Sequence, residues 1–230
     1  MNAFLHQSEN RGHIKADWLD TKYSFSFGDW YNLNYMGVGV LRAINDETIA
    51  PQHGFAPHSH SNMEILTCVL EGTICHSDSL GNERHITAGE WQLMSAGQGV
   101  QHSEMNQKNH PVRMLQIWIH PNIQDTEPHY QQMRCHSHDQ PNRWHLIASA
   151  SCTTAMCIQQ QTEIKTAVLE KYRHLAVKAT QKVNYIHVIA GKISIEERIL
   201  TAGDALLFAE DTQIKALQDS QLIWFDLPEI

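Results

Sequence analysis

The 230-residue sequence lacks the long apolar run that a membrane-spanning helix needs, because no stretch approaches about 18 consecutive apolar residues. Its first residues, Met1 to His6, contain no apolar core of the length found in signal peptides. The sequence also lacks an excess of basic residues, since 17 Lys and Arg stand against 25 Asp and Glu, a net charge of −8. A phosphate-binding surface needs a basic patch. We therefore expect a cytoplasmic protein that contacts neither membranes nor nucleic acid directly.

Cysteine is scarce, and the five cysteines are Cys68, Cys75, Cys135, Cys152 and Cys157. Their number is odd, and their spacing matches no zinc ribbon. In the absence of an export signal, we expect all five to be reduced thiols. Histidine, by contrast, is abundant, with 16 residues. A His-x-His pair can therefore arise by chance in this chain, and each pair needs independent support.

Short alternating segments between glycine and polar turns dominate the sequence. The segment from Tyr23 to Phe27 alternates aromatic and polar residues, which predicts a strand. A second strand is expected from Met36 to Ile44, ending in a turn at Asn45-Asp46-Glu47. Short strands at such regular spacing are typical of β-sandwiches and β-barrels.

The last third of the chain repeats the first β-rich region. Residues 184–193 resemble residues 64–74, and residues 199–206 resemble residues 86–93. Duplication of a β unit predicts two copies of one architecture. We place an N-terminal domain at 1–130 and a C-terminal domain at 131–230, with a polar crossing over 121–160.

Two pairs of potential metal ligands occur in the first repeat, each with i, i+2 spacing: His58 with His60, and His102 with Glu104. Alternate residues of a strand face the same side of a sheet. A polar cluster inside a small barrel is unfavourable unless it is satisfied, and a divalent metal satisfies imidazole nitrogens and a carboxylate. Glu64 would share the face of the first pair if that strand continued regularly. Spacing alone therefore leaves Glu64 and Glu104 as alternative carboxylate ligands.

Counting residues from the glycine turns of the two repeats distinguishes these ligand pairs from pairs that arise by chance. The same offsets from Gly191 and Gly203 in the second repeat reach no ligand, because the matching residues are Val177, Ala179, Ala216 and Gln218. The C-terminal domain is therefore predicted to bind no metal. The pair His136-Ser137-His138 has the same spacing, but no second pair follows it. We interpret His53 as a residue that could contact a metal ligand rather than the metal. We interpret His76, His85, His110 and His120 as strand residues that are solvated or hydrogen-bonded within the protein.

A series of motifs then resembles one family. These motifs are Arg11-Gly12-His13, Trp18-Leu19-Asp20, Phe25-Ser26-Phe27, residues 41–46, Pro57-His58-Ser59-His60 with Met63-Glu64, residues 69–72, residues 78–81, residues 94–97, His102-Ser103-Glu104 and residues 225–228. The sequence resembles the pirin family of bicupins, in particular the bacterial pirin-like quercetinases, densely over 10–120 and more thinly over 121–230. The resemblance implies an all-β bicupin, with two stacked antiparallel β-barrel or jelly-roll (cupin) domains and short helical segments.

The resemblance also implies a site and an activity. The family's metal ligands fall on His58, His60, His102 and Glu104. Glu64 is then expected to contact a ligand or to line the pocket, without binding the metal. We expect one divalent transition metal, Fe(II) in preference to Cu, Ni, Co, Mn or Zn. The implied activity is that of a quercetin 2,3-dioxygenase, an oxidoreductase that opens a flavonol ring with O2. The substrate and O2 would bind side by side at open positions of the metal. Glu104 would act as general base. The alternative is a non-catalytic, redox-sensing metal-binding regulator with protein partners. We expect a monomer in either case.

Two positions depart from the family pattern. Ser59 stands where members commonly have proline between the two histidines, and Cys68 stands where they commonly have tyrosine. Neither change removes a ligand. We expect both to alter the fine shape of the pocket.

Overall fold

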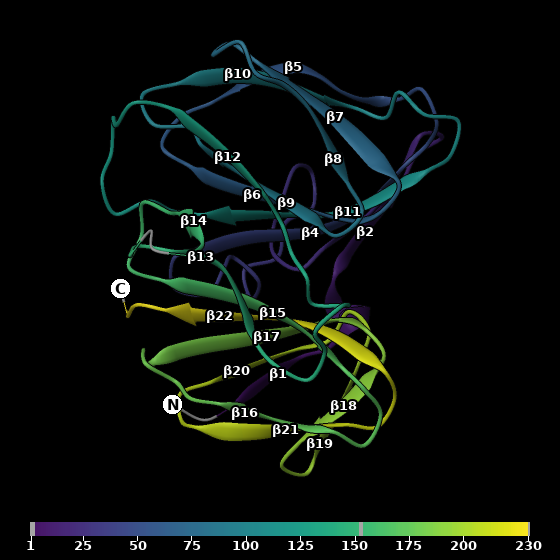
Figure 1. Ribbon diagram of the computed structural model, residues 1–230, viewed down its shortest axis with the longest axis vertical. Helices are drawn as coiled ribbons and strands as arrows, with labels where there is room; N and C mark the ends of the chain where they lie inside the picture. The colour runs from purple at the N-terminus through teal and green to yellow at the C-terminus, as the bar shows by residue number, and fades with distance from the viewer. Residues whose placement is uncertain (1–2, 152–153, 230) are drawn as a thin grey trace. The chain divides into compact units, whose positions relative to one another are not determined.

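A computed structural model describes residues 3–151 and 154–229, and almost all of its regular elements are β-strands (Figure 1). The chain divides into two compact units. The N-terminal unit consists of Arg11–Cys135 and Met156–Gln160, and the C-terminal unit consists of the described residues of 1–10, 136–155 and 161–230. The predicted all-β class is confirmed. The assignment of metal binding to 1–130 alone stays a prediction.

Two antiparallel sheets form the N-terminal unit. A seven-stranded sheet has the order β12-β9-β6-β11-β4-β3-β2, and a four-stranded sheet has the order β5-β10-β7-β8. The strands of this unit are β2 (Gly12–Lys15), β3 (Leu19–Tyr23), β4 (Leu41–Ile49), β5 (Gly54–His60), β6 (Glu64–Glu71), β7 (Thr73–Asp78), β8 (Glu83–Thr87), β9 (Glu90–Ser95), β10 (Val100–Met105), β11 (Val112–Ile119), β12 (His129–Arg134) and β14 (Met156–Cys157).

The C-terminal unit has the same plan. One sheet contains β1, β20, β17, β22, β15 and β13 in this order, and a four-stranded sheet has the order β16-β21-β18-β19. Its elements are β1 (Phe4–His6), the 3-10 helix η1 (Ser8–Asn10), β13 (His145–Ser149), β15 (Glu163–Leu169), β16 (His174–Val177), β17 (Val183–Ala190), β18 (Lys192–Ile195), β19 (Arg198–Thr201), β20 (Ala205–Phe208), β21 (Thr212–Ala216) and β22 (Ser220–Leu227).

The strand orders show the duplication directly. The run β9-β6-β11-β4 corresponds to β20-β17-β22-β15, and β5-β10-β7-β8 corresponds to β16-β21-β18-β19. Each unit thus has the two-sheet plan of a cupin jelly roll, but neither pair of sheets closes into a continuous barrel. Among the described residues, the only helical segment is the three-residue 3-10 helix η1, so the expected short helical segments are limited to this one. In the described part of the chain no helix is long and apolar enough to cross a membrane.

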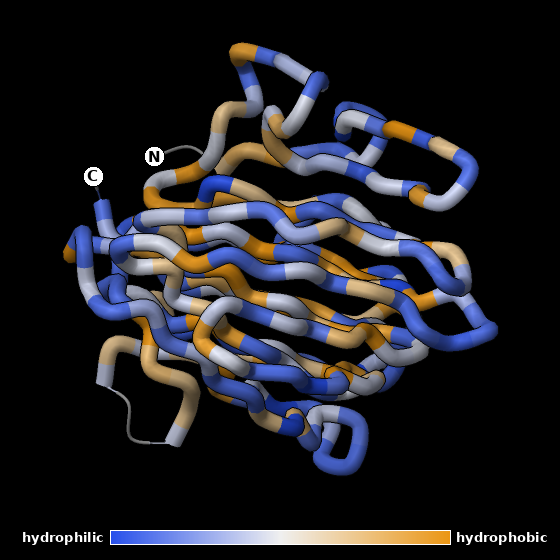
Figure 2. The backbone as a smooth tube through the Cα atoms, turned by 90° about the horizontal axis from the view of Figure 1, so that it is seen from above, coloured by the Kyte–Doolittle hydropathy of each residue, from blue (hydrophilic) through white to orange (hydrophobic). Residues whose placement is uncertain are grey.

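Alternation of apolar and polar residues along the strands builds the core of each unit, as the changing colours along the chain in Figure 2 show. In the N-terminal unit, one buried apolar cluster comprises Ile49, Val69, Ile74, Ile86, Val112 and Met114. In the C-terminal unit, a larger cluster includes Leu175, Val177, Ile193, Ile195, Ile214 and Ala216 from the four-stranded sheet. The C-terminal interior is therefore filled by apolar side chains at the level where a metal site would lie.

The expected turn at Asn45-Asp46-Glu47 is wrong, because these residues lie inside β4. Asn45 and Glu47 are buried, while Asp46 pairs with Arg113 of β11, with 2.9 Å between Nη2 and Oδ2. Polar residues suggest a turn only when their neighbours in space are unknown. Here Asn45 and Glu47 lie on the buried face of β4, and Asp46 pairs with the adjacent strand β11.

The strand register also corrects which residues of the C-terminal unit correspond to His102 and Glu104. In the C-terminal unit Ile195 of β18 lies opposite Ile214, as His76 of β7 lies opposite Glu104. The counterparts of His102 and Glu104 are therefore Thr212 and Ile214, four residues earlier than counting predicts. The count fails because β20 and the connection after it are shorter than β9 and its connection. The conclusion that these positions carry no ligand pair still holds.

The cysteines depart from the expectation at one position. Cys68, Cys75 and Cys135 carry buried free thiols, whereas Cys157 is disulfide-bonded. The prediction that all five are reduced is therefore wrong for Cys157, and Cys152 lies outside the described residues. Sequence spacing does not reveal which sulfur atoms a fold brings within bonding distance.

Gly54 allows β5 to approach the strand that carries the predicted ligands. A Cβ at this position would overlap the backbone oxygen of Glu104 and lie 2.7 Å from Cα of Met105. We expect Gly54→Ala to destabilise the protein by about 1–3 kcal/mol, because the backbone of β10 must move. Thermal or denaturant unfolding checks this, with Ala56→Val at an exposed position of β5 as the control. Equal stability of both variants would contradict the close approach.

Candidate metal centre

Antiparallel register aligns polar side chains across three strands of the four-stranded sheet. His102 of β10 lies opposite both His58 of β5 and Asp78 of β7, and Glu104 lies opposite His76. Directly opposed residues of antiparallel strands point to the same face. The register therefore brings the two predicted pairs together, and it adds His76 and Asp78 to the same face.

β5 contains a bulge directly before His58. The register shifts between the pairs His102–His58 and Glu104–Phe55, so β5 contains one residue more than β10 over this stretch. Pro57 lies within the shift, and β5 is an edge strand of its sheet. Proline has no N–H to donate, so a bulged edge strand accommodates it.

The potential ligand atoms form two overlapping triads. The outer triad is His58, His60 and His102, and the inner triad is His76, His102 and Glu104. Within each triad the ligand atoms lie within 4.8 Å of one another. His102 belongs to both. The three predicted histidine ligands therefore form the outer triad, whereas the predicted ligand Glu104 lies in the inner triad, which shares His102 with the outer one.

Glu104 is held from the facing seven-stranded sheet. Its Oε1 accepts hydrogen bonds from Thr67 Oγ1 at 3.1 Å and Gln92 Nε2 at 3.3 Å, and its Oε2 accepts one from Gln116 Nε2 at 2.7 Å. Burial raises the pKa of Glu104 to about 7, although these three hydrogen bonds act in the opposite direction. The carboxylate is therefore fixed in position and titrates near neutral pH.

The histidines fit a divalent metal. His102 is 1% exposed, and neither of its ring nitrogens has a hydrogen-bond partner among the described residues. Such a buried polar group is unfavourable unless something satisfies it. Burial, with the neighbouring histidines, lowers the pKa of His102 to about 3, and burial with His58 lowers the pKa of His60 to about 4. Neutral imidazole is the form that binds metals.

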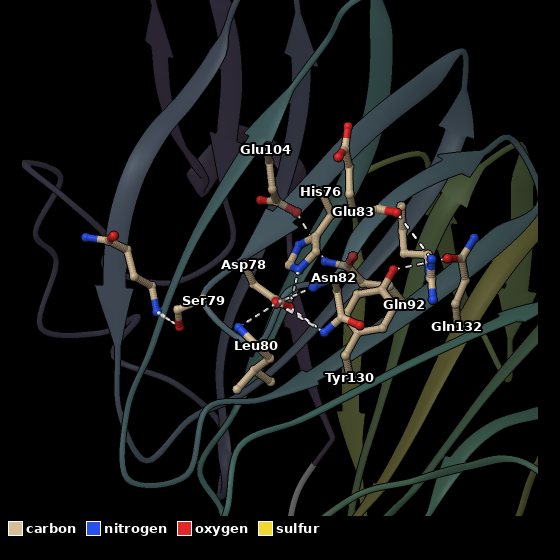
Figure 3. Close-up of polar contacts among 12 residues, drawn as sticks. His76, Asp78, Ser79, Leu80, Asn82, Glu83, Gln92, Glu104, Tyr130 and Gln132 are labelled. Atoms are coloured by element: carbon tan, nitrogen blue, oxygen red, sulfur yellow. Dashed lines mark hydrogen bonds and ion pairs between the residues drawn. The ribbon is translucent and has the colours of Figure 1, made fainter.

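His76 was expected to be a solvated or satisfied strand residue, and the structure corrects this in part. The side chains of His76 and Asp78 are fully buried, and Nε2 of His76 lies 2.9 Å from Oδ2 of Asp78. Figure 3 shows Asp78 between His76 and Asn82, whose side-chain amide donates to it at 2.9 Å. The ring of Tyr130 covers His76 at 4.8 Å between centroids. The sequence analysis missed this pair, although the i, i+2 spacing of His76 and Asp78 is a signal that could have indicated it.

Glu64 lies outside both triads. The first strand does not continue regularly, because β5 ends at His60 and β6 begins at Glu64 in the other sheet. Asn62, with φ of 51°, turns the chain between them. The carboxylate of Glu64 instead accepts hydrogen bonds from Ser95 Oγ at 2.8 Å and from the backbone N–H of Gln159 at 3.1 Å.

The remaining histidine candidates also lie elsewhere. His53 is exposed, and its Nδ1 lies 2.8 Å from the backbone oxygen of Pro51, so it does not join the triads. His136 is exposed and pairs with Asp139 at 2.9 Å. His138 is likewise exposed and belongs to neither triad.

The outer triad lies beside aromatic side chains. His58 and His60 are partly exposed, whereas His102, Glu104 and His76 are buried. Trp118 packs edge-on against His60 with 5.0 Å between centroids. Phe27 in turn contacts Trp118 at 4.8 Å. A ligand approaching from solvent would therefore reach the outer triad next to an aromatic wall formed by Trp118 and Phe27.

Comparison with known proteins matches both halves of the chain. The Pirin family model matches residues 5–119, and the model of the quercetinase C-terminal cupin domain matches residues 146–227. The chain is 36% identical to a quercetin 2,3-dioxygenase of Escherichia coli strain K12, with 99% of both proteins covered. It is 34% identical to a pirin-like protein of Caulobacter vibrioides, with 94% of both covered.

A solved structure gives the same result. The crystal structure of a bacterial pirin from Escherichia coli in complex with nickel(II) superposes with a TM-score of 0.94 at 35% identity, covering 99% of this chain and 100% of that one. A quercetin 2,3-dioxygenase from Acinetobacter baumannii, at 19% identity and a TM-score of 0.80, shares the fold. The resemblance expected from the sequence motifs is confirmed.

Proposed function

The chain belongs to the pirin family, and on that premise we propose that it is a metal-dependent dioxygenase that opens the ring of a flavonol such as quercetin with O2. The observation that carries the proposal is the cluster of two donor triads that share His102, with one side partly open to solvent. The names of the full-length relatives support the substrate class.

The proposed metal ligands are His58, His60, His102 and Glu104. Three imidazoles and one carboxylate suit Fe(II), which we favour, and also Cu, Ni, Co, Mn and Zn. Nickel(II) is bound by the related bacterial pirin. A bound divalent ion supplies Lewis-acid stabilisation of an oxyanion and a template for two reactants.

Glu104 would act as general base toward the 3-hydroxyl group of the flavonol. One of its carboxylate oxygens would take the hydroxyl proton. Thr67, Gln92 and Gln116 keep the carboxylate in place during this transfer. In the overall reaction both oxygen atoms of O2 enter the opened product, and one ring carbon leaves as carbon monoxide.

The aromatic wall would orient the substrate. Trp118 Nε1 donates a hydrogen bond to Oε1 of Gln116 at 3.0 Å, and Gln116 also donates to Glu104. The indole that faces His60 is therefore fixed to the same network as the general base. A flat flavonol ring stacks favourably against such aromatic side chains.

Aerobic incubation with quercetin tests the function. Metal-free protein, prepared with a chelator, is reloaded separately with Fe(II), Cu(II), Ni(II), Co(II) or Mn(II). We expect at least one metal form to consume the flavonol absorbance and release carbon monoxide. Metal-free protein and an anaerobic sample serve as controls and are expected to be inactive. No loss of absorbance with any of these ions would overturn the enzyme proposal and leave the regulatory alternative.

A further inference from the structure

The C-terminal unit contains a cavity at the place where the repeated fold corresponds to the metal centre. The cavity has a volume of about 240 Å³, and the residues at its base are Ile195 of β18, Leu206 and Phe208 of β20, and Thr212 of β21. By the strand register, Thr212 is the counterpart of His102, and Ile195 is the counterpart of His76. The second copy of the fold therefore has no metal ligands at these positions but has kept a space there.

The base of the cavity is apolar. Ile195 and Leu206 are each 1% exposed, and Phe208 is 6% exposed. All three belong to the apolar core cluster of the C-terminal unit, against which Ala3 also packs from one side of the cavity. Contact with these side chains favours an apolar group of a ligand, because it removes apolar surface from water.

Charged side chains surround the mouth of the cavity, and these are Glu196, Arg198, Glu210 and Asp211. Nη1 of Arg198 lies 2.7 Å from Oε2 of Glu196, and Nζ of Lys178 lies 2.8 Å from Oδ2 of Asp211. Glu210 is exposed, and it takes part in no ion pair among the described residues. The mouth thus carries one uncompensated charge, which is negative.

This arrangement does not resemble a metal site. Both clusters of three potential metal ligands in the described part of the chain lie in the N-terminal unit. At the mouth of the cavity, two of the three carboxylates already pair with a cationic side chain. A divalent ion needs several oxygen ligands, whereas an organic ammonium group can face one carboxylate and keep part of its water.

The cavity is smaller than the roughly 300–1,000 Å³ of sites for drug-sized ligands, so it suits a compound with a single ring. We propose that the C-terminal unit has a second ligand site, which binds a small amphiphilic ammonium compound. The apolar body of the ligand contacts Ile195, Leu206 and Phe208, and its ammonium group faces Glu210. The proposal does not depend on the dioxygenase activity, because every residue of this site belongs to the C-terminal unit.

Titration with 2-phenylethylammonium tests the site. The probe is added to isotope-labelled full-length protein, and nuclear magnetic resonance follows the backbone amides. We expect saturable shifts, in the millimolar range, at the amides of Ile195, Leu206 and Phe208. The anion 3-phenylpropanoate has the same ring and a similar length. It should bind roughly two- to fivefold more weakly, which is the range of an exposed ion pair.

The variant Thr212→Phe is designed to fill the cavity. Thr212, Ile214 and Ala216 are alternate residues of β21, so the new ring is expected to point to the interior face. Saturable binding of 2-phenylethylammonium should be lost. Gln213→Phe is the matched control, because the side chain of Gln213 is exposed on the opposite face, and it should bind the probe as the wild type does. Thermal unfolding of both variants monitors the fold.

A second variant tests the charge without filling the cavity. Glu210→Gln is expected to weaken binding of 2-phenylethylammonium roughly two- to fivefold and to reduce the preference over 3-phenylpropanoate. Glu197→Gln makes the same change at an exposed residue that does not line the cavity, and it should leave binding unchanged. The proposal would be overturned by the absence of shifts at the three base residues, by wild-type affinity in folded Thr212→Phe, or by equal binding of the two probes.

Discussion

Metal binding is expected to disappear when His102 is replaced by alanine, because His102 is the one residue that belongs to both triads. His102→Ala removes a donor from each arrangement at once, whereas His58→Ala leaves the inner triad intact. We expect Ni(II) affinity to fall by more than the roughly 10–100-fold that follows loss of an outer-shell partner. Quercetin consumption should fall to the level of metal-free protein. Calorimetric titration and flavonol absorbance measure the two effects.

The fold of this variant provides an internal check. The two ring nitrogens of His102 are buried without partners, so their removal relieves an unfavourable burial in the metal-free protein. The melting temperature of metal-free His102→Ala is therefore expected to be no lower than that of the metal-free wild type. The loss of binding is then not a consequence of unfolding.

A matched control exists elsewhere in the chain. The double variant His136→Ala, His138→Ala removes a pair with the same spacing as His58 and His60, but both of its histidines are exposed. Ni(II) binding and quercetin consumption should be unchanged. Wild-type affinity in His102→Ala, or loss of binding in the double variant, would show that the site lies elsewhere.

Replacing Glu104 by glutamine is expected to produce the largest loss of turnover at saturating metal. Glutamine keeps the shape of the side chain but provides no carboxylate for the ion and no general base. Removal of a general base typically costs about 10²–10⁴-fold in rate. The amide group also brings a donor toward the donors of Thr67, Gln92 and Gln116. Steady-state kinetics on metal-loaded protein, with the metal content of each sample measured, gives kcat separately from occupancy.

Glu64→Gln is the control for this prediction. Glu64 is as deeply buried as Glu104, but its carboxylate contacts Ser95 and the backbone of Gln159. We expect Glu64→Gln to keep metal binding, even if its stability falls. Normal binding and turnover in Glu104→Gln, together with loss of both in Glu64→Gln, would transfer the carboxylate role to Glu64.

Much of the fold followed from local patterns. Period-two alternation predicted an all-β chain, and the repeated glycine turns predicted two copies of one unit, which the matching strand orders show. Local patterns failed where the neighbouring strand decides the outcome. Asn45-Asp46-Glu47 has the composition of a turn, yet it lies within β4 because its side chains find a buried interior and Arg113.

The sequence by itself determined that His58 shares a face with His60, and His102 with Glu104, because strand periodicity is a local property of the chain. Only the tertiary structure decided which of these faces meet. The hydrogen-bond register of β5, β10 and β7 aligns residues that are far apart in sequence, and no local pattern encodes it. That register added His76 and Asp78 to the cluster. The turn at Asn62 excluded Glu64, because it carries the chain into the other sheet.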